Sequence, residues 1–323
     1  MFSLQKDAIL PSFNSYHVDQ VRCQPFLLLT MSNDFDPSSV KTRILLSHGK
    51  NGVVFQGNDA QGRAIAAIKM TLADVPLSYF EGDDYAAMKQ LKTEQENHRY
   101  AEAIARRQRI HLANEAQVLR NRRDNEKVSE YIVKYLGETP GEDGLLKELF
   151  IEIVPGQSIE AMVTNRSLPD DTTKQRVLMD VACAIKHLHE LNLIICKDEV
   201  DDQTYQRAIT KYYRDKGGVA HRDLHPGNVM ITTLGNSVKF IDFGFARDGP
   251  TEKQRKHDIK NFGGILATLF PQRGPALDKL YTDCFQEGTT VTAIEICQRL
   301  EEMMKPEVGR ASERRPVPQV DRW

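Results

Sequence analysis

The sequence has no excess of charge of either sign and no long hydrophobic run. Its 323 residues include 43 Lys and Arg against 45 Asp and Glu. This balance gives no reason to expect a nucleic acid or an acidic membrane surface as partner. The longest apolar run near the N-terminus, FLLLTM at 26–31, is too short for a signal-peptide core or a membrane span, and no basic segment precedes it. We therefore expect neither secretion through a signal peptide nor a membrane-spanning segment.

Closely spaced cysteines are also missing. The five cysteines form an odd number and no two are near neighbours in the sequence, which argues against a disulfide framework or a zinc knuckle. Reduced thiols in the cytoplasm or nucleus fit this pattern better. The cysteines are Cys23, Cys183, Cys196, Cys284 and Cys297.

The chain divides into a strand-rich part followed by a helix-rich part. Residues 1–41 have scattered Pro, Ser and Asn and predict an irregular extension. The runs RILLS, GVVFQG and RAIAAIKM then predict short strands. The charged stretch 81–127 has apolar residues at helical spacing and predicts one long helix, or two, with a mostly exposed face. An exposed helix explains these charges better than a nucleic-acid-binding arm does.

Two further strands, YIVKYLG and LLKELFIEIV, lead to the break VPGQS at 154–158, which is a good hinge. A helix is predicted over 172–191, where apolar residues recur on one side. The short strands NVMIT and VKFID lie close to the motifs HRDLHPGN and DFG.

Three features of the first half could serve phosphate binding. Gly49 and Gly52 lie in a turn between strands, where backbone N–H groups could close over phosphate oxygens, although a plain hairpin turn is an alternative. Lys69 ends an apolar strand and could grip the phosphates or simply be exposed. Glu115 lies four residues before Leu119 on the predicted helix and could either hold Lys69 in place or be a surface charge.

The second half supplies oxygen ligands and a base. Asp223 can accept the proton of an attacking hydroxyl, while Asn228 and Asp242 carry oxygens of the kind that Mg²⁺ prefers. Phe243 is expected to pack in a core, and His221 is expected to be a structural histidine.

These motifs occur in a fixed order: a glycine loop, a strand lysine, a helix glutamate, H-R-D-L-x-x-x-N and D-F-G. Over about residues 42–270 the chain therefore resembles the protein kinase superfamily. ELFIEIVPGQSI at 148–159 looks like the hinge of that family. HDIKNFGGILATLF at 257–270 looks like its helix F, whose aspartate, here Asp258, ties down the catalytic loop.

The resemblance implies an α+β, two-lobed protein-kinase-like fold. It has a small β-rich N-lobe with one long helix at 42–153, a helical C-lobe at 154–305, and a disordered tail at 306–323. It also implies ATP and Mg²⁺ as cofactors. The catalytic residues would be Asp223, Lys69, Glu115 and Asn228, the metal ligands Asn228 and Asp242, and the ATP-binding residues Gly49, Gly52, Val54, Ala67, Lys69, Glu152 and Val154, the last two through backbone groups.

The sequence departs from the family pattern in several places. Insertions are expected at 83–114 and 195–219. Only 13 residues separate Gly244 from Asp258, and no A-P-E follows the D-F-G. The activation segment is therefore nearly absent, and because Thr251 is its single candidate phosphorylation site, we expect activity without loop phosphorylation.

The catalytic loop itself bears on the acceptor. His225 occupies the position where many protein kinases have Lys, which resembles aminoglycoside and choline kinases. Two residues after His225, at a position where tyrosine kinases have Arg, this chain has Gly227. A tyrosine acceptor is therefore disfavoured. We expect a Ser/Thr protein kinase acting on a protein substrate. The alternatives are a small-molecule kinase and a non-enzymatic nucleotide-binding pseudokinase.

Overall fold

The structure is a computed structural model that describes residues 35–49, 52–122, 126–141, 144–190, 218–233, 237–286 and 291–305. All of these described residues fall within one compact unit. Most of the expected extension 1–41, most of the insertion 195–219 and the whole tail 306–323 lie outside the described residues.

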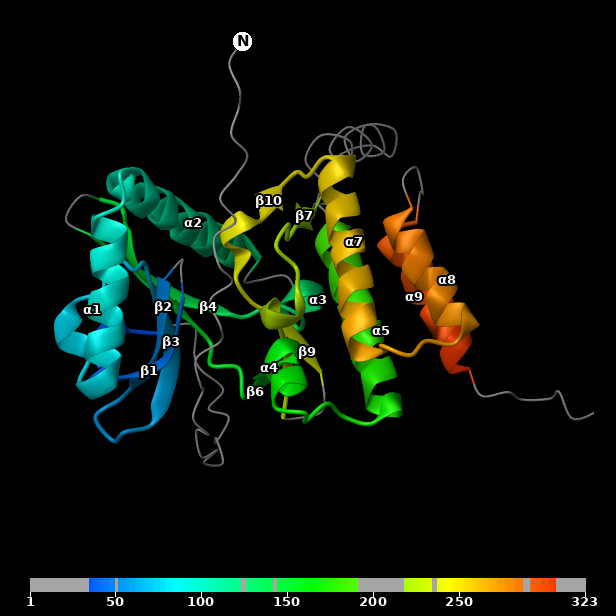
Figure 1. The fold of residues 1–323 in the computed structure, drawn as a ribbon, viewed down its shortest axis with the longest axis horizontal. Coiled ribbons are helices and arrows are strands. Elements are labelled where there is room, and N and C mark those ends of the chain that lie inside the picture. The colour runs from blue at the N-terminus through cyan, green and yellow to red at the C-terminus, as the bar shows by residue number, and fades with distance from the viewer. Residues whose placement is uncertain are drawn as a thin grey trace, which may run out of the picture. The chain divides into compact units, whose positions relative to one another are not determined.

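The first half of the chain builds an antiparallel five-stranded sheet in the order β1-β2-β3-β5-β4 (Figure 1). Strand β2 alternates in burial along most of its length, as expected for a sheet with two distinct faces. The strands are β1 (Thr42–Gly49), β2 (Gly52–Asn58), β3 (Ala64–Met70), β4 (Tyr135–Pro140) and β5 (Leu146–Ile151).

The sequence predicts one long helix or two in the charged stretch between β3 and β4. The structure has two. They are α1 (Gly82–Glu96) and α2 (Ala101–Arg122), and the first ends at its C-cap Asn97. The short helices η1 (Pro37–Ser39), η2 (Leu77–Tyr79) and α3 (Glu126–Ser129) complete this half.

Two hydrophobic cores meet the two faces of the sheet. Ala66, Ile68 and Met70 of β3 belong to a core that includes Met88 of α1. Ala67, on the opposite face of the same strand, belongs to the larger core that continues into α2 and the helical half. Strand alternation therefore decides which β3 side chains can reach the second half of the molecule.

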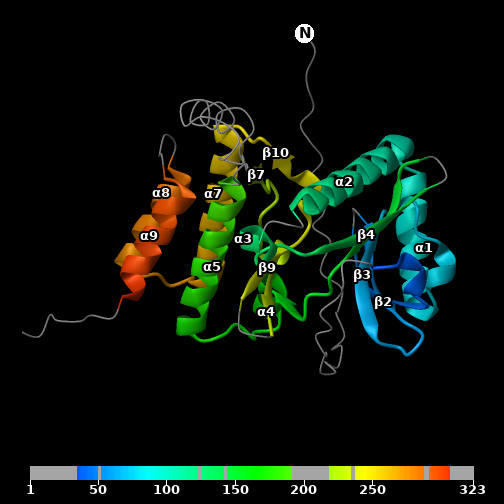
Figure 2. The same ribbon diagram turned by 180° about the vertical axis from the view of Figure 1, so that it is seen from behind.

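The second half is mainly helical, and Figures 1 and 2 show α8 and α9 alongside α5 and α7. Two small sheets, in the orders β6-β8-β9 and β10-β7, hold the loops that carry the motifs. The helices are α4 (Ile159–Thr164), α5 (Asp171–His189), α7 (Glu252–Leu269), α8 (Pro275–Phe285) and α9 (Ala293–Met304), with short turns η4 (Pro226–Asn228) and η5 (Phe243–Phe245). The strands are β6 (Gly156–Ser158), β7 (Val219–Ala220), β8 (Val229–Thr232), β9 (Val238–Phe240) and β10 (Arg247–Asp248).

One predicted strand is only partly a strand of the large sheet. The run YIVKYLG enters β4 at Tyr135, whereas the residues before it pair elsewhere. Phe240 of β9 donates its N–H to the carbonyl of Tyr131 at 2.7 Å and accepts from the N–H of Val133 at 3.1 Å. The apolar run therefore divides its backbone between the two halves of the molecule.

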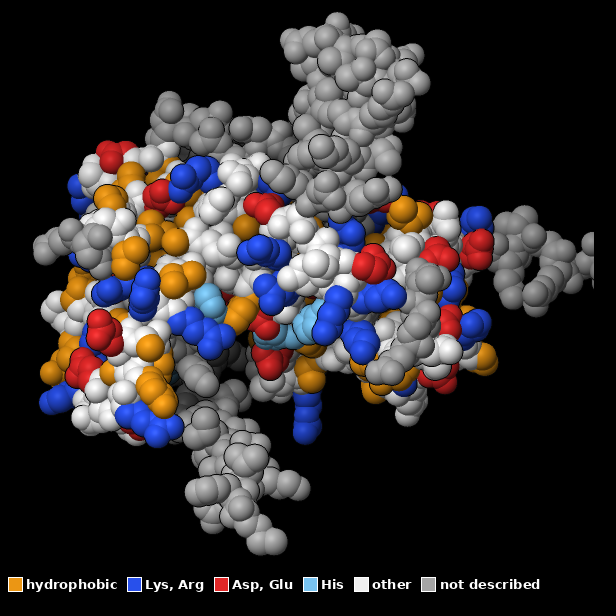
Figure 3. Space-filling model, turned by 90° about the horizontal axis from the view of Figure 1, so that it is seen from above, with side chains coloured by type: hydrophobic (Ala, Val, Ile, Leu, Met, Phe, Trp, Pro, Cys, Tyr) orange, Lys and Arg blue, Asp and Glu red, His pale blue; other side chains and the backbone are white. Residues whose placement is uncertain are grey.

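The arrangement is the α+β, two-lobed one that the sequence predicts, with a small β-rich part followed by a helical part. The boundary at 153/154 stays a prediction. Among the described residues, no helix is both long and apolar enough to span a bilayer. One face of the surface shows Lys and Arg side chains interspersed with Asp and Glu (Figure 3), in keeping with the balanced composition.

Candidate active site

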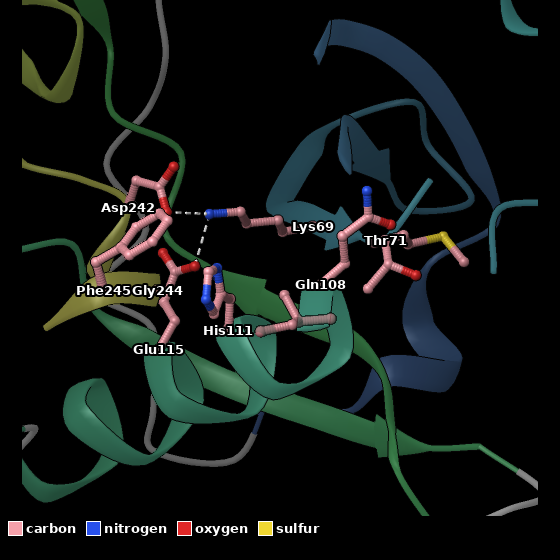
Figure 4. A pocket seen from close by; sticks show the side chains of 10 residues that line it. Lys69, Thr71, Gln108, His111, Glu115, Asp242, Gly244 and Phe245 are labelled. Carbon is pink, nitrogen blue, oxygen red and sulfur yellow. Dashed lines mark hydrogen bonds and ion pairs between the residues drawn. The ribbon is translucent and has the colours of Figure 1, made fainter. Parts of the chain in front are cut away.

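Lys69 lies at the centre of the candidate site (Figure 4). It is on the same β3 face as Ala67 and directly opposite Leu149 of β5, so its side chain leaves the sheet toward α2. Its Nζ donates to Glu115 Oε2 at 2.6 Å and to Asp242 Oδ1 at 2.8 Å. Burial alone would lower the pKa of Lys69, but the two carboxylates outweigh this effect and raise it, so the side chain is an ammonium.

Glu115 faces inward because it lies in the apolar stripe of α2. Leu112, Ala116 and Leu119 are buried around it at helical spacing, and Glu115 itself is 1% exposed. Burial raises the pKa of Glu115, and Asp242 adds to this effect, while Lys69 opposes it. Its Oε1 is buried and has no hydrogen-bond partner within the described part of the chain.

Asp242 has a backbone conformation that is unusual for a residue with a side chain. Its φ of 63° is in the left-handed region. This conformation costs free energy, so it persists only where contacts with the surroundings fix it. Burial alone would raise the pKa of Asp242. The charge and the hydrogen bond of Lys69 outweigh this effect and bring the pKa below its ordinary value, so the carboxylate is ionised. Two carboxylates thus face one ammonium.

The loop that carries Asp223 is tied to α7 by Asp258. The buried carboxylate accepts from the backbone N–H of His221 at 2.8 Å and from that of Arg222 at 2.7 Å, and it lies 3.0 Å from His189 Nε2. These bonds are the anchoring expected of the aspartate in the predicted helix F. His221 is buried with its Nε2 3.0 Å from the carbonyl of Ile241, as expected of a structural histidine.

Asn228 connects the two motifs. Its Nδ2 donates to the carbonyl of Asp223 at 2.8 Å, and its own carbonyl accepts from the N–H of Ile241 at 3.1 Å, next to Asp242. Since the amide nitrogen is bound to the loop, the side-chain oxygen is the atom available to a ligand. The structure therefore brings Asp223, Asn228, Asp242, Lys69 and Glu115 into one connected arrangement.

His225 is exposed next to this loop. Its Nδ1 accepts from the N–H of Gly227 at 3.1 Å, which places the proton of a neutral ring on Nε2. The ring can therefore still donate one hydrogen bond outward.

The predicted ATP-binding residues lie along the sheet and its edge. Gly49 pairs with Gly52 at the β1–β2 turn, and a Cβ on Gly52 would lie 2.3 Å from the carbonyl oxygen of Met70, so a side chain there would clash with backbone. Val54 of β2 lies directly opposite Lys69.

In the middle of the sheet, Ala67 of β3 lies opposite Ile151, the last residue of β5, which falls within the predicted hinge segment 148–159. Glu152 donates its N–H to the carbonyl of Lys134 at 2.9 Å, and Val154 follows two residues later. The ATP-binding roles of these residues stay predictions.

The segment after Asp242 is short and pairs with residues next to the catalytic loop. Arg247 and Asp248 form β10, which pairs with Ala220 and Val219 just before the catalytic loop. Thr251 is the N-cap of α7 and makes a reciprocal capping box with Gln254. The only threonine of this loop thus already has a structural role.

The donor set fits Mg²⁺. Asp242 and Asn228 offer oxygens, which hard cations prefer, and the surplus of carboxylate over ammonium around Lys69 favours a cation nearby. Within the described residues no group of three or more His, Cys, Asp and Glu is gathered for a metal. The set is therefore short of a full protein shell, and Mg²⁺ characteristically completes its coordination with phosphate and water oxygens.

Sequence reasoning missed several residues beside Lys69. A cavity of about 20 Å³, roughly the room of one water molecule, lies on the α2 side of the lysine. His111 and Gln108 of α2 and Phe245 line it, and Figure 4 shows their side chains beside Lys69. Asn114 bonds the segment after Asp242. The signal that the sequence offered was position: Gln108, His111 and Asn114 all lie on α2 within two helical turns before Glu115.

Two comparisons with known proteins agree with this geometry. Residues 196–252, which include both motifs, match the phosphotransferase enzyme family (APH). The chain is also 23% identical over 219 residues to mitogen-activated protein kinase kinase kinase 15 of Mus musculus. That match covers 68% of this chain but 12% of the mouse protein.

Proposed function

Because the chain belongs to the protein kinase-like superfamily, we propose that it is an ATP-dependent phosphotransferase that moves the γ-phosphoryl group to a hydroxyl. One observation carries the proposal: Lys69 is held between Glu115 and Asp242, next to the loop of Asp223 and Asn228. Phosphoryl transfer needs positioning and charge neutralisation more than covalent chemistry, and this arrangement supports both.

Each residue has one task in the proposal. Lys69 grips the α- and β-phosphates, and Glu115 keeps its ammonium in place. Asp223 accepts the proton of the acceptor hydroxyl. Asp242 and Asn228 would hold Mg²⁺, which when bound neutralises charge on the phosphates. His225 Nε2–H can donate to a phosphate oxygen where a lysine would otherwise do so.

The favoured acceptor is a Ser or Thr hydroxyl of a protein. The similarity to a protein kinase kinase kinase runs over 68% of the chain, and the anchoring of the loop by Asp258 resembles that family. A small-molecule acceptor is the second candidate, supported by the APH match across the catalytic loop and by His225. The absence of close cysteine pairs from the sequence supports a cytoplasmic or nuclear location.

The test is ATP-dependent labelling with γ-labelled ATP, followed by mass spectrometry of what became labelled. Wild type is compared with Asp223→Ala, Lys69→Ala and Asp242→Asn, and with Asp171→Asn as an exposed control. We expect Asp223→Ala to abolish turnover while nucleotide affinity is kept. Lys69→Ala should lower kcat on the order of 10²–10³-fold, because it removes a donor that positions the α- and β-phosphates and offsets their charge.

The acceptor is tested on casein-type proteins beside a panel of aminoglycosides, choline and sugars. Labelling of protein Ser or Thr supports the first candidate, and labelling of a small molecule supports the second. Full activity of Asp223→Ala would contradict the assignment of the base.

A further inference from the structure

Asn114 of α2 binds the backbone that follows Asp242. Its Nδ2 lies 3.3 Å from the carbonyl oxygen of Phe243, 3.1 Å from that of Gly244 and 3.0 Å from that of Ala246. One side-chain amide thus serves three carbonyls of a single tight turn. The amide has two N–H donors for these three acceptors, so one N–H is shared between two carbonyls and both donors point at this turn.

Two more contacts join the same helix to the same segment. One turn before Asn114, the ring of His111 packs edge-on against Phe245 with centroids 4.2 Å apart. Two turns after it, the guanidinium of Arg122 pairs with the carboxylate of Asp248 in β10. The helix α2 is therefore bonded along one side to residues 243–248.

Asp242 needs such support because its own backbone is strained. A non-glycine residue at a φ of 63° keeps that conformation only if its surroundings fix it. The turn directly after it, η5, is the part that Asn114 binds. The neighbouring Glu115 meanwhile holds Lys69. Adjacent residues of α2 thus fix the two partners of one ion pair, Lys69 and Asp242.

We infer that Asn114 is a positioning residue that fixes the conformation of residues 242–246 and so the direction of the Asp242 carboxylate. This inference rests on the proposed function for its consequence in catalysis, since Asp242 would be a Mg²⁺ ligand. In this view, contacts from α2 place the Asp242 carboxylate, and no phosphorylated side chain is required.

The test replaces the amide in two ways. Asn114→Asp keeps the shape but replaces the donor with oxygen acceptors, and Asn114→Ala removes the donor without adding charge. Asn121→Asp makes the same chemical change at an exposed position of the same helix and is the control. Hydrogen exchange of the amides of 243–248 is measured first, because it needs neither substrate nor turnover.

Both Asn114 variants should exchange at least about tenfold faster at 243–248, and the control should not. In phosphate transfer, their half-saturating Mg²⁺ concentration should rise and kcat should fall on the order of 10–10²-fold, as expected for a misplaced group. A general loss of stability would not change the Mg²⁺ requirement selectively.

Unchanged exchange at 243–248 in both variants overturns the inference, even if wild type transfers phosphate. An unchanged Mg²⁺ requirement in an active enzyme also overturns it. If wild type shows neither transfer nor Mg²⁺–ATP binding, the proposed function fails, and the exchange result alone then decides whether Asn114 fixes the segment.

Discussion

Among single side chains, Thr251 can be either a phosphorylation site of the segment after Asp242 or a purely structural helix cap. Its hydroxyl caps α7 and accepts from the N–H of Gln254. We predict that Thr251→Ala lowers the free energy of unfolding by about 1 kcal/mol, the usual cost of losing an N-cap, and leaves turnover within about twofold of wild type. Urea unfolding and phosphate-transfer assays measure the two effects.

Thr292 offers a matched control, because it forms the same type of capping box at the start of α9. Thr292→Ala should cost a similar amount of stability and leave turnover unchanged. If Thr251→Ala abolishes turnover and Thr292→Ala does not, phosphorylation of Thr251 matters, and the prediction of activity without loop phosphorylation is wrong.

Neighbouring residues show how far side chains can be predicted from sequence. Glu115 could be chosen because it shares a helical face with Leu119, and the structure pairs it with Lys69. Asn114 could not be chosen in the same way, because neither its residue type nor its spacing in the helix indicates the backbone that it binds. Its three acceptors are backbone carbonyls about 130 residues away, and a carbonyl leaves no mark in a sequence.

Among the helices and strands, α2 is joined by an ion pair to the loop that follows β3. Arg109 of α2 binds Asp74 through two nitrogens, with Nε 2.9 Å from Oδ2. This pair fixes α2 close to the strand that carries Lys69. We predict that Asp74→Asn lowers the free energy of unfolding by about 1.5–3 kcal/mol, the usual range for a hydrogen bond to a charged group. It should also slow turnover by loosening the Lys69–Glu115 contact.

The pH dependence of this effect has a definite sign. Burial raises the pKa of Asp74, but hydrogen bonds from Arg109 and Thr71 outweigh it and hold the pKa below its ordinary value of 3.8. A lowered pKa adds stability above the unfolded value, and this stability is lost as pH falls through the folded pKa. The difference between wild type and Asp74→Asn, measured by urea unfolding, should therefore narrow below about pH 4. A difference that stays constant down to about pH 3 would contradict the assignment.

The elements also show where sequence patterns stop being informative. Periodic runs such as α5 and strand β2 are predicted correctly because their burial follows a period of the chain itself. The two-residue strands β7 and β10 have no period, and they form only because the loops at 219 and 247 are brought together. YIVKYLG predicts one strand for a run that is shared between two partners, Phe240 and β5.

For the chain as a whole, the site is where its two halves join. Lys69 and Glu115 come from the first half, and Asp223, Asn228 and Asp242 from the second, so the ion pair between Lys69 and Asp242 bridges them. The order of the motifs predicted this meeting, because each motif lies in the local structure that its role needs. The acceptor could not be predicted in the same way, since it depends on surfaces beside the loop.

A ligand that bridges both halves should stabilise the chain as one unit. At a concentration of 100 times its Kd, Mg²⁺–ATP adds about 2.7 kcal/mol of stability to a protein that binds it only when folded. For a chain of this size we predict a rise in Tm of roughly 4–5 °C, measured by differential scanning calorimetry. Asp242→Asn should lose most of the Mg²⁺-dependent part of the rise but keep the part due to nucleotide alone. A rise without phosphate transfer would favour a nucleotide-binding protein that does not catalyse, and no rise in wild type would contradict ATP binding, because a ligand held by both Lys69 and Asp242 must oppose their separation.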